Sequence, residues 1–129
     1  MGIRYEKDTI LNWINEMGKF LRLIVEKYDA FEKVDKQQLD QDGYVSFFGK
    51  PRQYFSDLSD DGLKDFVSTL QVEQIRPLAQ LMMYDGLLMK DKSLLQKAKF
   101  LFNHHMQVSG SFSFEDYAYL DKIEKALIA

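Results

Sequence analysis

The hydrophobic and polar positions of the C-terminal half follow helical spacing, and they are densest over residues 72–89. Apolar side chains there fall on nearly every side of the predicted helix, and only Gln80, Tyr84 and Asp85 interrupt them. A helix that is apolar all round has to be covered on several sides. The pattern therefore predicts that this helix lies at the centre of an all-helical core.

Pro77 stands inside that central helix, where a proline removes one hydrogen bond and clashes with the preceding turn. We therefore expect the helix to begin nearer Gln74 or to kink at the proline. A second helix follows a tight turn, with Asp91 or Ser93 as its N-cap, and Gly110 is a suitable C-terminal stop. The two elements together predict a helical hairpin.

An amphipathic pattern predicts the N-terminal helix over residues 6–28. At about 100° per residue, its apolar positions fall within an arc of about 120°. These positions are Ile10, Trp13, Ile14, Met17, Phe20, Leu21, Ile24 and Tyr28. Leu11 and Leu23 lie outside this stripe, and they fit either scattered surface residues or a second contact face.

The signals are weaker after this first helix. Phe31, Val34 and Leu39 predict a short helix within residues 29–41, and the Asp-Gly pair at residues 42–43 is typical of a turn. Residues 44–55, the aromatic connector, follow. We expect an ordered loop whose aromatic side chains cover the core, with a short strand or a ligand-facing loop as the alternatives. Its aromatic residues are Tyr44, Phe47, Phe48, Tyr54 and Phe55.

Two further helices have clear starts. Ser59 suits an N-cap, and Leu58 and Leu63 stand at the two positions of a hydrophobic staple. Ser113 suits the N-cap of the last helix, with Asp116 three residues later. The whole pattern predicts a single compact all-α domain of five to six helices over residues 1–129.

The composition fits a binding domain better than a nucleic-acid-binding protein or a membrane protein. The chain has 129 residues, 46% of them hydrophobic, with no cysteine and a net charge of −3. A protein that binds nucleic acid normally carries a basic patch, and none is visible. The densest cluster of lysines, at residues 90–99, fits solvated helix flanks. Without a signal segment, a spanning segment or cysteine, we expect a cytoplasmic protein that enters no membrane.

No residue pattern predicts a catalytic, cofactor-binding or metal site. His104 and His105 are adjacent, so on a helix they cannot face one ion together. His105 lies in the apolar stripe, which favours a hydrogen-bonded core histidine over a general base. Residues 38–49 and 57–68 match calcium loops in part, but both lack the bidentate glutamate of the last position. We therefore expect no enzyme and no cofactor.

Residues 86–102 resemble half of a tetratricopeptide repeat, in which two antiparallel helices meet at small residues. Gly86 and Ala98 stand twelve positions apart, as the two small residues of that family do, and Phe102 stands at its aromatic position. Met89 and Gly110 depart from the family's aromatic and proline. The resemblance implies a helical hairpin and supplies no catalytic residue.

A repeat array is not predicted, because the positions 34 residues earlier do not match the pattern. They are Arg52, Lys64 and Ser68. The whole chain, opening with YEKDTI at residues 5–10, also resembles a family of small uncharacterised bacterial helical proteins with a tetratricopeptide-like C-terminal hairpin. That resemblance implies a fold and no activity.

The leading hypothesis from sequence is a protein–protein interaction or adaptor domain with a protein partner, and a homodimer is one form of it. The alternative is a small-molecule-binding protein or cryptic enzyme with a pocket near the aromatic connector. A third is a subunit that docks through Leu11 and Leu23 on a larger assembly. The exterior near Phe100 is a further candidate surface.

Overall fold

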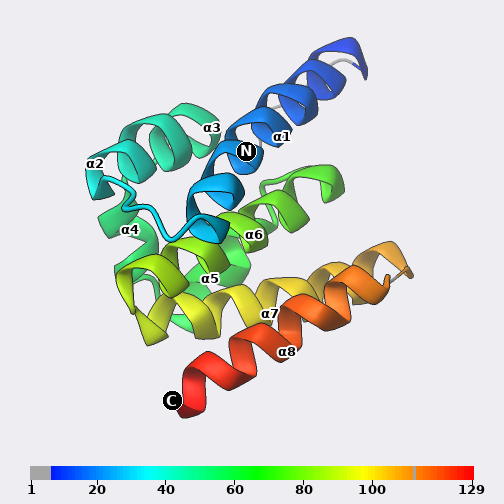
Figure 1. Cartoon of the computed structure of the whole chain (residues 1–129). Helices are drawn as coiled ribbons and strands as arrows, with labels where there is room; N and C mark the ends of the chain where they lie inside the picture. Colours follow the sequence, from blue (N-terminus) through cyan, green and yellow to red (C-terminus); the bar gives the residue numbers. More distant parts are fainter. Residues whose placement is uncertain (1–6, 112) are drawn as a thin grey trace. The chain divides into compact units, whose positions relative to one another are not determined.

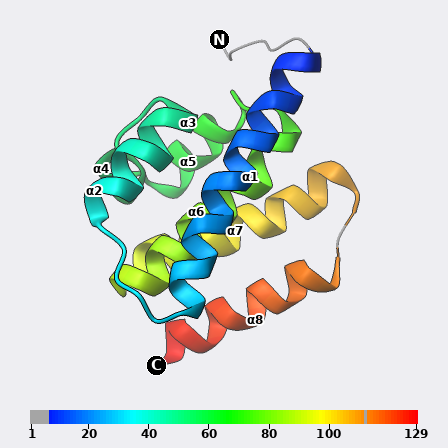
Figure 2. The same cartoon turned by 45° about the horizontal axis from the view of Figure 1, so that its top comes forward.

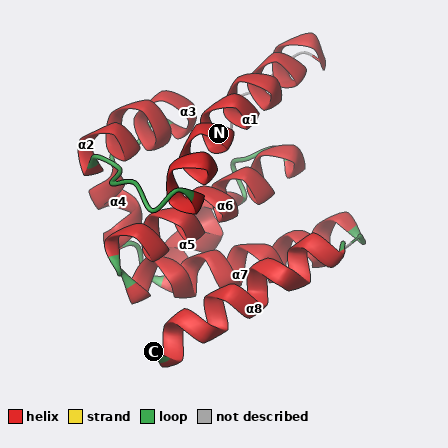
Figure 3. Cartoon of the chain, in the orientation of Figure 1, coloured by secondary structure: helices red, strands yellow, loops and turns green. Residues whose placement is uncertain are grey.

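The computed structural model describes residues 7–111 and 113–129, and it confirms the all-α class. These residues form seven continuous helical segments, with no β-strand among them (Figures 1 and 3). The chain divides into two compact units, Met1–Gln71 and Val72–Ala129, called here the N-terminal and C-terminal units. One domain over residues 1–129 stays a prediction.

The N-terminal unit contains one long helix and several short ones. They are α1 (Lys7–Asp29), then α2 (Lys36–Gln38), η1 (Leu39–Val45) and α3 (Ser46–Phe48) in one continuous run, then α4 (Arg52–Asp57) and α5 (Asp60–Val67). The predicted start of the first helix at Glu6 lies outside the described residues. Most of the predicted stripe of α1 is buried, whereas Leu11 and Leu23 face outward.

The segment after α1 differs from the prediction. Phe31 is not part of a helix, because it occupies the left-handed position that ends α1, with φ +56° and 97% of its surface exposed. The Glu32 N–H donates to the Lys27 carbonyl (2.9 Å), as in a Schellman motif. The next helix begins only at Lys36, after the N-cap Asp35.

The predicted turn at residues 42–43 and the predicted loop at residues 44–55 are also wrong. Residues 42–45 lie in η1, whose wider π-helical turns continue into α3, and only residues 49–51 interrupt the helices. Burial of Leu39 and Tyr44 explains the difference, since packing overrides the turn preference of an Asp-Gly pair.

The aromatic connector covers the core, as expected, and does so from helices. The indole N–H of Trp13 donates to the Phe47 carbonyl (3.1 Å). The ring of Phe55 stacks on Tyr44 (5.1 Å between centroids) and meets Phe66 of α5 edge-on (5.0 Å). Ser59 caps α5 by accepting from the Gly62 N–H, which confirms that N-cap.

The C-terminal unit consists of three helices, each antiparallel to the next (Figure 2). They are α6 (Val72–Met89), α7 (Lys92–Ser109) and α8 (Phe114–Ile128). The helix predicted to be apolar all round is α6, and its residues 78–86 are almost wholly buried, which includes Asp85. Asp91 caps α7 and Ser113 caps α8, and Gly110 ends α7 in the left-handed conformation, as predicted.

The helix predicted over residues 72–89 is confirmed as α6 (Val72–Met89), and the alternative start near Gln74 is wrong, because Pro77 lies inside the helix. The missing proline N–H leaves the carbonyl of the exposed Glu73 without its helical partner, and water can satisfy it there. Gly86 brings the hairpin together: a Cβ at this position would lie 2.7 Å from Leu95 Cγ and 3.0 Å from the Asp91 carbonyl oxygen. Only glycine fits so close an approach of α6 to the start of α7.

Candidate functional site

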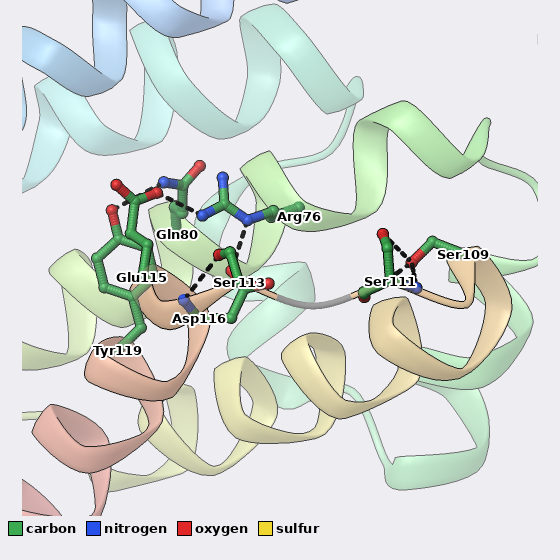
Figure 4. Close-up of polar contacts among 8 residues, drawn as sticks. All are labelled: Arg76, Gln80, Ser109, Ser111, Ser113, Glu115, Asp116 and Tyr119. Atoms are coloured by element: carbon green, nitrogen blue, oxygen red, sulfur yellow. Dashed lines mark hydrogen bonds and ion pairs between the residues drawn. The ribbon is translucent and has the colours of Figure 1, made fainter.

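The most elaborate polar arrangement of the C-terminal unit joins α6 to the first turns of α8 (Figure 4). We call it the Arg76 clasp, and it consists of Arg76, Gln80, Glu115, Asp116 and Tyr119. The first two residues come from α6 and the other three from α8. The sequence analysis singled out neither Arg76 nor Glu115, because partners about forty positions apart leave no local pattern.

Arg76 holds two consecutive carboxylates. Its Nε donates to Asp116 Oδ1 (2.7 Å), and its Nη2 donates to Glu115 Oε1. Only 5% of the Asp116 side chain is exposed, whereas Glu115 faces solvent. The inner half of the clasp is therefore a sheltered ion pair, in which water screens the attraction between the two charges less than in a surface pair. Although burial opposes its charge, these two carboxylates raise the pKa of Arg76.

Tyr119 ties the clasp to the apolar interior. Its hydroxyl accepts from Gln80 Nε2 (3.2 Å), and the Arg76 guanidinium lies over its ring, 5.7 Å from the centroid. The same ring lies near Phe102 of α7, at 5.4 Å between centroids. Burial raises the pKa of Tyr119, so the phenol stays protonated. Tyr119 thus contacts both other helices of the unit.

His105 of α7 lies within electrostatic reach of the clasp. Its Nδ1 is buried and has no hydrogen-bond partner among the described residues, so the expected hydrogen-bonded core histidine is wrong for this atom. Burial lowers the pKa of His105, and the charge of Arg76 lowers it further, while Asp116 raises it. His104 instead stacks on Phe100, at 5.7 Å between centroids. No group of metal-ligating side chains occurs among residues 7–111 and 113–129.

The clasp fixes the rotation of α8 about its own axis. With Asp116 and Ile123 turned inward, the opposite side of the helix faces solvent. We call that outward line of residues the α8 stripe. It consists of Phe114, Tyr117, Asp121, Lys125 and Ile128.

The α8 stripe exposes large apolar side chains. Phe114 is 94% exposed, Tyr117 51% and Ile128 84%. Phenylalanine and isoleucine are usually buried, and exposed apolar residues that share one face mark a contact surface more often than scattered ones do. This stripe was not predicted, because only the start of the last helix, at Ser113 and Asp116, was read from the sequence.

Two other surfaces expected from sequence, the aromatic connector and the exterior near Phe100, are less open, whereas Leu11 (48%) and Leu23 (52%) are exposed. The aromatic connector turns most of its rings inward, and Lys97, predicted to be a solvated flank, is nearly buried and donates to Ser93 Oγ (2.8 Å). Lys99, near Phe100, pairs with Glu124 of α8 (2.6 Å). Both lysines near Phe100 therefore have partners within the chain.

A shallow polar hollow of about 470 Å³ lies in the N-terminal unit. Its lining combines carboxylates, amides and two basic side chains. The lining residues are Asp35, Lys36, Gln37, Asp40, Gln41, Arg52 and Gln53. The Asp40 carboxylate accepts from the Arg52 backbone N–H (2.8 Å), which holds α4 against η1 at this hollow.

Comparison of the chain with protein-family models, with curated proteins and with solved structures gives no significant match. The resemblance to a tetratricopeptide hairpin therefore stays a prediction. None of the helices in the described part of the chain combines the length and the hydropathy that crossing a membrane needs.

Proposed function

We propose that this protein is a protein–protein interaction or adaptor domain without catalytic activity, and that the α8 stripe is its binding surface. The observation that carries the proposal is the exposure of Phe114, Tyr117 and Ile128 on one side of α8. Full burial of a phenylalanine or isoleucine side chain contributes about 1.5–3 kcal/mol, so a partner that covers two of them gains a substantial part of a binding free energy.

The clasp supports this proposal through preorganisation. A partner gains little from exposed aromatic residues on a mobile helix, because ordering the helix opposes binding. Arg76 anchors the first turn of α8 at Glu115 and Asp116, directly between Phe114 and Tyr117 in the sequence. The two aromatic side chains are therefore presented from a fixed support.

The sequence agrees with a binding role inside a bacterial cell. The resemblance to half of a tetratricopeptide repeat, to which Gly86 and Ala98 contribute, fits a binding scaffold and brings no catalytic residue. The lack of cysteine fits a cytoplasmic location.

A pull-down from a native bacterial lysate tests the proposal. The bait is the full chain, the test variant is Phe114→Ser with Tyr117→Ser, and the matched control is Leu11→Ser with Leu23→Ser on the outward side of α1. We expect specific partners with the unaltered chain and the control, and their loss with the test variant, while far-UV circular dichroism stays unchanged. Equal capture by the unaltered chain and the test variant contradicts the proposal. If the partners are lost with the α1 control instead, the result favours a subunit that docks through Leu11 and Leu23 on a larger assembly.

The polar hollow of the N-terminal unit supports a second candidate function, the binding of a small polar molecule. The hollow adjoins the aromatic connector at Arg52 and Gln53 and offers both charges and several amides. A thermal-shift screen with polar metabolites tests this function. A true ligand raises Tm for the unaltered chain and no longer does so for Gln41→Trp, which fills the hollow. A shift of the same size in both proteins contradicts binding there.

A further inference from the structure

We infer that the partner of the α8 stripe is a second copy of this chain, with the two α8 helices antiparallel about a two-fold axis. This inference rests on the proposed function and names the occupant of the same surface. Its basis is the order of chemical groups along the stripe, which is complementary to its own reversed copy.

The stripe has two apolar ends and a charged middle. The N-terminal end presents Phe114 and Tyr117, and the C-terminal end presents Ile128. Between them, Lys125 Nζ and Asp121 Oδ2 form an exposed ion pair at 2.9 Å. The span from Phe114 to Ile128 is fourteen residues, which corresponds to about 21 Å of helix.

An antiparallel arrangement matches these groups twice. With the two-fold axis at the level of residue 123, Asp121 of each copy faces Lys125 of the other. In the same register, Tyr117 and the neighbouring Ala118 face Ile128 of the other copy, and Phe114 stands about one helical turn beyond that contact. A two-fold interface requires such reciprocity, since each contact occurs in both directions.

A parallel arrangement of the two α8 helices is disfavoured by repulsion between like charges. It places every residue of the stripe opposite itself, so Asp121 faces Asp121 and Lys125 faces Lys125 across the interface. Like charges at that distance repel. The nearby Glu124, which pairs with Lys99 of α7, also faces itself in the parallel form and adds to the repulsion. The charged middle therefore selects the antiparallel form.

The size of the stripe sets the expected affinity. Stable interfaces bury roughly 1,600 Å² in total, and a contact one helix wide over residues 117–129, about 18 Å long, buries less. We therefore expect a reversible dimer with a Kd on the order of 10–100 µM.

Sedimentation equilibrium of the full chain, from about 5 to about 500 µM, tests the inference around that Kd. The unaltered chain is expected to dimerise. Lys125→Asp, which sets carboxylates against carboxylates, is expected to raise Kd at least tenfold. The double exchange Asp121→Lys with Lys125→Asp restores opposite charges across the axis and is expected to restore the dimer.

Engineered cysteines then test the orientation, because the chain has none of its own. Tyr117→Cys and Ile128→Cys are prepared as separate single variants and oxidised mildly, alone and mixed. An antiparallel dimer gives a disulfide dimer in the mixture, while each variant alone stays at the level of Phe31→Cys. That control is similarly exposed but lies in the N-terminal unit.

The outcomes separate the two proposals. A chain that stays monomeric throughout, or cross-links more in the single variants than in the mixture, overturns the antiparallel dimer. If such a chain still captures partners that depend on Phe114 and Tyr117, the interaction function survives and the second-copy partner does not. A dimer that neither Lys125→Asp nor Phe114→Ser with Tyr117→Ser weakens forms through another surface and overturns the α8 dimer, while the pull-down still decides the interaction function of the stripe.

Discussion

Gly86→Ala tests whether α6 and α7 meet as closely as the structure places them. Alanine inside a helix is more favourable than glycine by about 1 kcal/mol, so an unhindered substitution stabilises the protein. At Gly86, however, the new Cβ meets Leu95 Cγ at 2.7 Å, Leu95 Cδ2 at 2.9 Å and the Asp91 carbonyl oxygen at 3.0 Å. These separations are about 0.5–1 Å shorter than an ordinary carbon contact.

The hindrance outweighs the gain in helix propensity. Leu95 is buried and the Asp91 oxygen belongs to the backbone, so neither can move aside without shifting the start of α7. Overpacking of this kind costs about 1–3 kcal/mol. We expect a net loss of up to about 2 kcal/mol from the free energy of unfolding, which lowers Tm by up to about 8 °C for a chain of this length.

Gly18→Ala is the matched control. Gly18 also lies inside a long helix, α1, but a Cβ there meets nothing within 4 Å. We expect this variant to gain about 1 kcal/mol, the propensity term alone. The two substitutions are chemically identical, so the opposite signs isolate the steric contact at Gly86.

Urea unfolding followed by far-UV circular dichroism measures both variants, and the fluorescence of the single tryptophan, Trp13, adds a probe of α1. A stabilisation of Gly86→Ala equal to that of Gly18→Ala would refute the close approach of the hairpin.

The unfolding of the unaltered chain also tests the predicted single domain. Coincident transitions by the two probes support one cooperative unit, whereas separate transitions contradict it.

Three further predictions concern charge and backbone conformation. Arg76→Met leaves the sheltered Asp116 carboxylate without its partner, so urea unfolding should show a loss of about 2–3 kcal/mol, and a loss near zero contradicts the clasp. The folded-state pKa of His105 lies below its ordinary 6.5, so folding favours the neutral imidazole; stability is full above pH 6.5 and declines as the pH falls toward the folded value. His105→Gln should flatten that decline of the free energy of unfolding between pH 8 and pH 5. An unchanged slope against pH contradicts His105 as the cause of the decline. Phe31→Gly and Lys90→Gly should each raise the free energy of unfolding by about 1 kcal/mol, because both positions have positive φ, and thermal melts that show a loss contradict the helix-end geometry.

Much of the helical framework was predictable because its signals are local. The periodicity of α1 and α6 needs only neighbouring turns of the same helix. The caps Ser59 and Ser113 bond to backbone groups three residues away, so a short motif reveals them. Local signals failed over residues 31–48, where an Asp-Gly pair became helical and Phe31 took a left-handed conformation. There the packing of Leu39 and Tyr44 outweighed the preference of the pair.

The candidate site was almost invisible in the sequence. Arg76 and Asp116 are 40 residues apart, and nothing in either neighbourhood predicts that they meet. That His105 Nδ1 has no hydrogen-bond partner in the described part of the chain is equally a result of which side chains surround it. The α8 stripe could have been found, because a second apolar line on α8, opposite to Ile123, is visible as a helical pattern.

The sequence by itself therefore determined that the chain is helical, where most helices begin and end, and that α6 is covered all round. Those properties follow from periodicity and capping, which depend on residues a few positions apart. Tertiary structure alone decided the Arg76 clasp, and the clasp, together with burial of Ile123, settled which of the two apolar lines of α8 faces solvent. A rotation of α8 by half a turn would bury Phe114 and expose Ile123, and the sheltered pairing of Arg76 with Asp116 excludes it.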